Sequence, residues 1–268
     1  MNGTQLRLIS TDFDGTIVDW ERPPFISPDF CEAVRDVQER GGFWAINTGR
    51  SIPQLEQGIL DLRFPVEPDY IITLERAVHH RPGKRGSWED FGDWNRRCDL
   101  AHERLHREAE EIYKEVTAYA ATQKGLMTPT SEDGWLDGLI AVNDAQMDDA
   151  VEFLKKLQPR LPDLNFQRNG VYLRLCHVDY HKGSALTELA RLLEIPREGI
   201  LAAGDNFNDL PMLNGGAAAW VTCPVNAIPE VKQTVELARG FVAKSVAGAG
   251  VAEALRAWPW KSEEWPRI

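Results

Sequence analysis

Short apolar runs alternate with amphipathic segments along the first 80 residues. The runs at 6–11, 43–46 and 70–72 are followed by polar or turn-forming residues and predict buried strands. Between them, 30–40 and 52–60 have apolar residues three and four positions apart, as amphipathic helices do. Strands that alternate with helices in this way predict an α/β fold with a parallel sheet.

The pattern changes after a cluster of Pro, Gly, Lys and Arg at 81–86, which we interpret as a linker. A long polar helix is predicted over 95–123 and a strand over 135–142. Asn169-Gly170, between apolar residues, predicts a tight hairpin. Antiparallel strands beside helices indicate a separate α+β unit in this part of the chain.

The first pattern then resumes. The further predicted elements are a helix over 182–193, strands over 199–203 and 217–221, and a helix over 251–258. We therefore predict a discontinuous α/β core, residues 1–83 and 179–268, with an α+β unit inserted at 84–178. Trp258, Trp260 and Trp265 are expected to pack the C-terminal tail onto the core.

Composition places the chain among ordinary globular proteins. Its 268 residues are 43% hydrophobic and 26% charged, which excludes collagen-like, disordered and coiled-coil classes. The net charge of −11 argues against a nucleic-acid partner, since binding to phosphate backbones needs a basic surface. A small anionic substrate needs only a local group of donors and remains compatible with this charge.

The cysteines and the apolar runs predict a cytoplasmic protein. The four cysteines are widely spaced and form no Cys-x-x-Cys pair, so neither a disulfide framework nor a structural zinc site is expected. The N-terminal residues lack the pattern of a signal peptide. No apolar run approaches the roughly 20 residues that a membrane-spanning helix needs, so no membrane association is expected.

Two carboxylates follow the first predicted strand, in the sequence Asp12-Phe13-Asp14-Gly15-Thr16. Close carboxylates repel unless a cation neutralises them or one is protonated. Mg²⁺ suits such a place because it prefers one or two carboxylates together with water and phosphate oxygens. One carboxylate would attack phosphorus while the other moves the proton. The alternative is a turn with two solvated aspartates.

Two further segments offer groups for an anion. Thr48 and Gly49 follow the second strand, where a hydroxyl and backbone N–H groups at a helix start form an anion site. The alternative is an ordinary helix cap. Lys182 lies at the start of a predicted helix, where a cation opposes the helix dipole unless it binds something such as phosphate. The alternative is a solvated lysine.

A fourth group of polar residues follows the strand predicted over 199–203. Asp205, Asn208 and Asp209 lie within five residues of one another and directly before a helical pattern. The two aspartates are close enough in sequence to approach one cation, and the alternative is a polar loop with a helix cap. All four segments follow predicted strands or begin helices of the core, where ligands of open α/β sheets bind.

Taken together in this order, the four motifs resemble those of the haloacid dehalogenase superfamily of phosphohydrolases. The resemblance covers about 1–80 and 178–250, and the inserted unit is similar in position to that of the Cof-type and sucrose-phosphatase branch. It implies a Rossmann-like parallel-sheet core with an α+β cap domain at 84–178. The resemblance also implies that Asp12 is the nucleophile and Asp14 the general acid and base. The residues it implies as phosphate ligands are Thr48, Gly49, Lys182 and Asn208. The Mg²⁺ site would contain Asp12, the Asp14 backbone carbonyl, Asp205 and Asp209, where Asp209 either supports the metal or positions Lys182.

The chain departs from this branch at two places near the substrate entrance. After the third strand, where the branch often has Asn-Gly-Ala, this sequence reads Thr-Leu-Glu-Arg-Ala at 73–77. Where the branch often has Met-Gly-Asn-Ala after the fourth motif, it reads Ala-Ala-Ala-Trp-Val at 217–221. The catalytic assignment is unaffected, but substrate identity cannot be carried over.

The expected function is Mg²⁺-dependent hydrolysis of a small phosphate monoester, a sugar phosphate by resemblance, through an aspartyl-phosphate. Alternatives of the same class are a sucrose- or mannosylglycerate-phosphate type of phosphatase and a phosphomutase. Two alternatives come from other classes. His102 and His106 match His-Glu-x-x-His, the pattern of a zinc peptidase, although the surrounding charges favour a solvated helix face. The last alternative is a non-catalytic binding protein that uses the same pocket.

Overall fold

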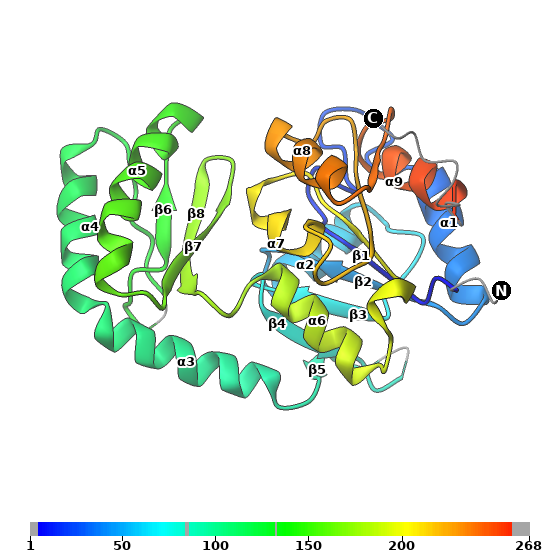
Figure 1. Ribbon diagram of the computed structural model, residues 1–268, viewed down its shortest axis with the longest axis horizontal. Coiled ribbons are helices and arrows are strands. Elements are labelled where there is room, and N and C mark those ends of the chain that lie inside the picture. The colour runs from blue at the N-terminus through cyan, green and yellow to red at the C-terminus, as the bar shows by residue number, and fades with distance from the viewer. Residues whose placement is uncertain (1–4, 84–85, 132, 259–268) are drawn as a thin grey trace.

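The computed structural model describes residues 5–83, 86–131 and 133–258 and contains two sheets (Figure 1). Among these residues the larger sheet has eight strands in the order β11-β10-β9-β1-β2-β3-β4-β5. Its strands are β1 Leu8–Thr11, β2 Phe43–Asn47, β3 Tyr70–Thr73, β4 Ala77–His80, β5 Glu89–Asp90, β9 Ile200–Ala203, β10 Trp220–Cys223 and β11 Phe241–Val242. Neighbours pair in parallel except β3 with β4 and β4 with β5. The predicted α/β fold is therefore confirmed, with an antiparallel edge.

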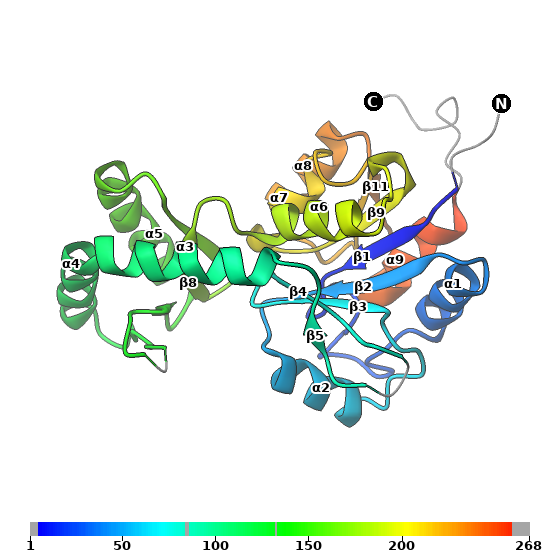
Figure 2. The ribbon, with the colours of Figure 1, turned by 90° about the horizontal axis from the view of Figure 1, so that it is seen from below.

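Helices cover both faces of the larger sheet. They are α1 Pro28–Glu39, α2 Ile52–Asp61, α6 Lys182–Leu192, α7 Leu210–Leu213, α8 Pro229–Leu237 and α9 Ala247–Arg256. Figure 2 shows α6, α7 and α8 on one face and α1, α2 and α9 on the other. Successive residues of β1 point to opposite faces: Leu8 belongs to the cluster that contains Leu186, and Ile9 to the cluster that contains Phe30. All four residues of β1 are buried, although only Leu8 and Ile9 are apolar.

The parallel pairing brings the carboxyl ends of the central strands to one edge. Thr11, the last residue of β1, is in register with Ile46 of β2 and Ala203 of β9. The residues that follow these strands are therefore neighbours in space although they are far apart in sequence. This edge is where the candidate site lies.

The inserted unit has a smaller antiparallel sheet in the order β6-β8-β7. Its elements are α3 Trp94–Glu108, α4 Glu110–Thr122, β6 Gly138–Ile140, α5 Asp144–Leu157, β7 Leu164–Asn169 and β8 Tyr172–His177. A separate apolar cluster, which includes Leu139, Met147 and Leu173, forms its core. The predicted hairpin is present, and Gly170 has the positive φ of 55° that such a turn requires.

The single helix predicted over 95–123 is two helices that meet at Ala109. The backbone of Ala109 has φ −87° and ψ 0°, and its N–H donates to Leu105 O at 2.8 Å. In Figure 1, α3 runs from the larger sheet to the inserted unit and α4 then turns along that unit's edge. Leu105, Ala109 and Ile112 are all buried, so the apolar spacing continues across the bend. Periodicity alone could not reveal the change of direction.

The larger sheet also extends beyond the predicted domain border at residue 84. Strand β5 pairs with β4, although it lies inside the range 84–178 that we assigned to the cap. The Asn95 side chain bonds both the N–H and the C=O of Val78, at 2.7 and 2.9 Å. The Pro-Gly sequence after β4 thus precedes a further strand of the core, and Lys84 and Arg85 lie outside the described residues.

Two other expectations concern the surface and the tail. No helix among the described residues has the length and apolarity needed to cross a bilayer. The ring of Trp258 packs edge-on against Trp220, with centroids 4.5 Å apart, as expected for a tail that contacts the core. Trp260 and Trp265 lie outside the described residues.

Candidate active site

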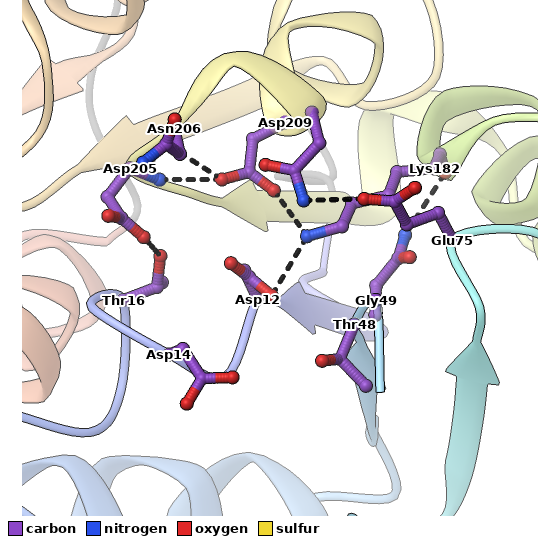
Figure 3. Close-up of polar contacts among 12 residues, drawn as sticks. Asp12, Asp14, Thr16, Thr48, Gly49, Glu75, Lys182, Asp205, Asn206 and Asp209 are labelled. Carbon is purple, nitrogen blue, oxygen red and sulfur yellow. Dashed lines mark hydrogen bonds and ion pairs between the residues drawn. The ribbon is translucent and has the colours of Figure 1, made fainter. Parts of the chain in front are cut away.

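The buried ammonium group of Lys182 lies at the centre of the site (Figure 3). Its Nζ is 2.8 Å from Asp12 Oδ1, after β1, and 2.7 Å from Asp209 Oδ1, after β9. Burial alone would lower the pKa of Lys182, but these carboxylates outweigh it and raise that pKa above its ordinary value. Lys182 therefore stays charged and holds two segments of the core together.

Asp209 organises the loop after β9. While Oδ1 contacts Lys182, its Oδ2 accepts the backbone N–H groups of Asp205 and Asn206 at 2.8 and 3.0 Å. Both oxygens of Asp209 are thus occupied by protein donors. This arrangement favours the second of the two roles that the sequence left open, the positioning of Lys182.

The carboxylates of Asp12 and Asp205 each retain an oxygen for a cation. Asp12 Oδ2 is buried and has no hydrogen-bond partner in the part of the chain that the structure describes. Asp205 Oδ1 accepts the Thr16 hydroxyl at 2.6 Å, which leaves Oδ2 of Asp205 for a cation. Potential ligand atoms of Asp12, Asp205 and Asp209 lie within 4.8 Å of one another. An orphaned carboxylate oxygen in such a group fits a hard divalent cation.

The electrostatics agree with a cation at this place. Burial raises the pKa of Asp12 well above its ordinary value, with Lys182 acting in the opposite direction. Burial, helped by Asp209, raises the pKa of Asp205 to about 7. The protein thus crowds carboxylates in a poorly solvated place, and positive charge there would stabilise their ionised forms. Gly15 allows this crowding: it has φ 76°, and a Cβ on it would lie 2.5 Å from Asp205 Oδ2.

Asp14 lies outside this acidic group. Arg50 Nε and Nη2 donate to its two oxygens at 2.8 and 2.7 Å, and Trp20 Nε1 donates to Oδ1 at 2.8 Å. Figure 3 shows its carboxylate directed away from Asp12 and Lys182. Asp14 lies near the site because it follows Asp12 by two residues. Its side chain, however, is held by Arg50 and Trp20.

The predicted phosphate ligands occupy two sides of the site. Thr48 is buried after β2, and its Oγ1 accepts the Arg50 N–H at 3.2 Å. The neighbouring Gly49 lies beside the side chain of Glu75, since a Cβ on Gly49 would be 3.4 Å from Glu75 Oε1. Asn208 donates its Nδ2 to that same oxygen at 2.8 Å, so one of its amide hydrogens already has a partner.

Sequence analysis missed two charged residues next to these groups. Glu75 is buried after β3, and Arg174 reaches from β8 of the inserted unit to donate to Gly49 O at 3.2 Å. The departure from Asn-Gly-Ala marked the first of them as unusual. No sequence pattern indicated Arg174, because its proximity depends on how the inserted unit packs against the core.

Comparison with known proteins identifies the family. The sequence profile described as haloacid dehalogenase-like hydrolase matches residues 103–255, more than half of the chain. The chain belongs to the haloacid dehalogenase-like hydrolases. The resemblance inferred from the four motifs is therefore confirmed, and the acidic group around Lys182 is the candidate active site of such a hydrolase.

The sequence matches between this hydrolase and its relatives cover nearly its whole length. Phosphoglycolate phosphatase of Methanothermobacter thermautotrophicus is 32% identical over 255 residues, covering 94% of this chain and 98% of its own. A 5-amino-6-(5-phospho-D-ribitylamino)uracil phosphatase of Bacillus subtilis is 21% identical over 267 residues, covering 94% and 96%. Both are named as phosphatases, which supports the expected class of enzyme.

Solved structures show the same fold. The sucrose-phosphatase of Synechocystis sp. PCC6803, solved with sucrose and phosphate, has a TM-score of 0.67 at 18% identity, covering 94% of this chain and 97% of its own. A Thermoplasma acidophilum protein has a TM-score of 0.63 at 17% identity, covering 94% and 97%. Each match spans both the core and the inserted unit. An α/β core with an inserted unit, as predicted for the hydrolase, is therefore found in known proteins.

The histidines of the zinc-peptidase alternative have other partners. His102 Nδ1 is 2.8 Å from Cys98 O, and its Nε2 accepts the His177 N–H at 3.2 Å. His106 Nδ1 lies 2.9 Å from the Tyr113 hydroxyl. Within the described part of the hydrolase, only the three carboxylates of the active site form a group that could hold a metal. The geometry therefore contradicts the zinc-peptidase alternative.

Proposed function

We propose that the protein is a Mg²⁺-dependent phosphatase that hydrolyses a small phosphate monoester through an aspartyl-phosphate. The observation that supports this most directly is the state of Asp12. One oxygen is held 2.8 Å from Lys182 Nζ, and the other is buried with no hydrogen-bond partner within the described ranges. A carboxylate in this state is oriented, poorly solvated and able to attack phosphorus.

In the first step, an oxygen of Asp12 forms a bond to phosphorus while the bond from phosphorus to the leaving oxygen breaks. Lys182 and Thr48 bind phosphoryl oxygens and keep the group in line. Such positioning and charge neutralisation account for most of the catalysis in phosphoryl transfer. Asp14 gives its proton to the leaving oxygen, so that the product departs as a neutral alcohol.

In the second step, Asp14 takes a proton from water, whose oxygen attacks phosphorus. The bond between phosphorus and Asp12 then breaks, which releases inorganic phosphate and restores the carboxylate. Because Arg50 and Trp20 hold Asp14 away from Asp12, both steps require its side chain to rotate out of this ion pair. Substrate binding is the event that we expect to favour the rotation.

Asp12, Asp205 and the backbone carbonyl of Asp14 would hold the Mg²⁺ ion, and Asp209 would support them. When bound, the ion supplies positive charge that offsets the repulsion between the phosphoryl group and the carboxylates.

The inserted unit acts as a cap that excludes water and contacts the leaving group. We place this division of the chain at the end of β5 and before α6.

A sugar phosphate is the substrate that we propose, by resemblance to the sucrose-phosphatase branch. A glycosyl-phosphate phosphatase of the sucrose- or mannosylglycerate-phosphate type differs only in the leaving group. A phosphomutase would use the same Asp12 intermediate but pass the phosphoryl group to a second hydroxyl. Release of inorganic phosphate, measured beside isomer formation on the same sugar phosphate, separates the two reactions.

The first test uses a chromogenic phosphate monoester. We expect wild-type protein to hydrolyse it with Mg²⁺ and to lose activity on chelation. The Asp12→Asn variant should lose at least about a thousandfold in kcat, because it lacks the nucleophile. Asp36→Asn, the same substitution at an exposed position of α1, should retain activity. Activity that persists in folded Asp12→Asn would contradict the nucleophile, and a wild type that binds phosphate esters without turnover would indicate a binding protein.

A further inference from the structure

We propose that Glu75 and Arg174 form a subsite for hydroxyl groups of the leaving group, so that the protein selects phosphorylated sugars and polyols over phosphorylated carboxylic acids. The inference rests on the proposed function and assigns its specificity to two residues. Neither residue belongs to the four motifs.

Glu75 presents an unsatisfied acceptor at the edge of the site. Its Oε1 accepts Asn208 Nδ2 at 2.8 Å, whereas Oε2 is buried and has no hydrogen-bond partner among the described residues. The residue is only 5% exposed. A buried carboxylate oxygen without a donor is costly, so the arrangement is best explained by a donor that the ligand brings. Figure 3 shows the Glu75 carboxylate on the side of Lys182, above Gly49.

The backbone holds Glu75 in this place against its conformational preference. Leu74 and Glu75 both have positive φ, 51° and 66°, a region that residues other than glycine rarely adopt. Two hydrogen bonds fix the turn to the predicted phosphate loop: Leu74 N–H donates to Arg50 O at 3.0 Å and Glu75 N–H donates to Thr48 O at 2.9 Å. Both residues lie at the centre of the turn between β3 and β4, whose geometry requires positive φ at two successive positions.

Arg174 provides the complementary donor from the cap. Its Nη1 donates to Gly49 O at 3.2 Å and lies 3.9 Å from Glu75 Oε2, too far for a hydrogen bond. Its Nε is 3.8 Å from Asp137 Oδ1. The guanidinium has five N–H groups, so donors remain for a ligand. The pair therefore places an acceptor without a donor beside a donor with spare hydrogens.

The chemistry of this pair selects among leaving groups. A hydroxyl group donates to Glu75 and accepts from Arg174, so it satisfies both. A carboxylate accepts from Arg174 but is repelled by Glu75 and Asp137, and an ammonium group is repelled by Arg174. The relative named phosphoglycolate phosphatase acts, by its name, on an ester that contains a carboxylate. Glu75 leads us to expect the opposite preference here.

The test measures binding without turnover, so that it does not depend on catalysis. In the Asp12→Asn background with Mg²⁺, calorimetry gives the Kd of two matched pairs of esters. Glycerol 3-phosphate is compared with 3-phosphoglycerate, and sorbitol 6-phosphate with 6-phosphogluconate. Within each pair a terminal hydroxymethyl group is replaced by a carboxylate, and the two lengths allow for the distance from the phosphate to Glu75.

We expect the polyol ester of at least one pair to bind more tightly than its acid. Glu75→Gln, which keeps an acceptor for Asn208 but loses the charge, should weaken polyol binding about 10- to 100-fold and reduce or reverse the preference. Glu188→Gln removes a buried, arginine-paired carboxylate elsewhere and should leave the preference unchanged. The inference would be overturned if the two esters bound equally in both pairs, or if none of them bound. The same change of Kd for both esters of a pair in Glu75→Gln would also overturn it. Hydrolysis of the chromogenic ester by wild-type protein tests the proposed function separately.

Discussion

At the scale of single residues, the site depends on one buried cation that is shared between carboxylates. Lys182 is fully buried, and Asp12 and Asp209 lie within 2.8 Å of its Nζ. Each charge is tolerated in the interior only because the others are present. Removing the lysine would leave both carboxylates without a cation. Removing either aspartate would leave Lys182 with one carboxylate partner fewer.

We therefore expect Lys182→Met to lower the free energy of unfolding by about 3–5 kcal/mol in the absence of Mg²⁺. Added Mg²⁺ should restore part of this loss, because the ion neutralises the same carboxylates. Denaturant titrations with and without Mg²⁺ measure both effects. Lys155→Met, which breaks an exposed ion pair on α5, should change the value by about 1 kcal/mol or less. A loss as small in Lys182→Met would contradict the role of Lys182.

The same scale shows which residues could be predicted. Asp12, Lys182 and Asp209 were foreseeable because each follows a strand or begins a helix at one edge of a parallel sheet. The ion pair of Asp14 with Arg50 was not, because it depends on side-chain rotamers that no spacing encodes. Glu75 was recognised only as a departure from the usual motif, and its unsatisfied oxygen required atomic positions.

At the scale of elements, the position of Lys182 depends on how closely α6 approaches α7. Gly183, the second residue of α6, packs against the backbone of Pro211 in α7. A Cβ on Gly183 would lie 2.2 Å from Pro211 O, a distance that backbone atoms cannot tolerate without moving. The close contact sets where the first turn of α6, and with it Lys182, enters the site.

Gly183→Ala should therefore displace the start of α6. We expect a loss of about 1–3 kcal/mol in the free energy of unfolding, as in other overpacked cores, and a larger fall in kcat than this loss of folded protein explains. Gly216→Ala is a suitable control, since its closest contact is the side-chain oxygen of Asn214 at 3.0 Å. Denaturation and steady-state kinetics on the two variants decide the matter, and equal kcat values would show that the contact does not position Lys182.

Most elements were predictable because their apolar periodicity reflects burial. The bend between α3 and α4 was not, since Leu105, Ala109 and Ile112 keep helical spacing through it. Strand β5 was missed for another reason: Glu89–Asp90 is short and exposed, so its residues show no apolar pattern. Edge strands of this kind are recognised by their hydrogen-bond partners, which the sequence does not reveal.

At the scale of the whole molecule, the tip of the β7–β8 hairpin is one of the places where the cap contacts the core. Gly170 N–H donates to Asn206 Oδ1 at 3.3 Å, beside the acidic group, and the Arg168 guanidinium lies 4.8 Å from the centroid of the Phe207 ring. Next to these contacts, Phe166 and Leu210 contribute to a cleft of about 670 Å³ between the two units. The tip of the hairpin is therefore held against the loop after β9 by one hydrogen bond and one cation–π contact.

These contacts lead to a last prediction about cap opening. Phe207→Leu keeps an apolar side chain but removes the ring under Arg168, an interaction of about 0.5–1 kcal/mol at exposed sites. Cap opening should become about two- to fivefold more frequent, and the Gly170 amide should exchange its hydrogen faster by the same factor. Phe207→Tyr retains a ring and should exchange like the wild type. If the leucine and tyrosine variants exchange equally, Arg168 and Phe207 do not hold the cap. Faster exchange in the leucine variant alone would show that the contact between Arg168 and Phe207 helps to hold the hairpin tip against the loop that contains Asp205.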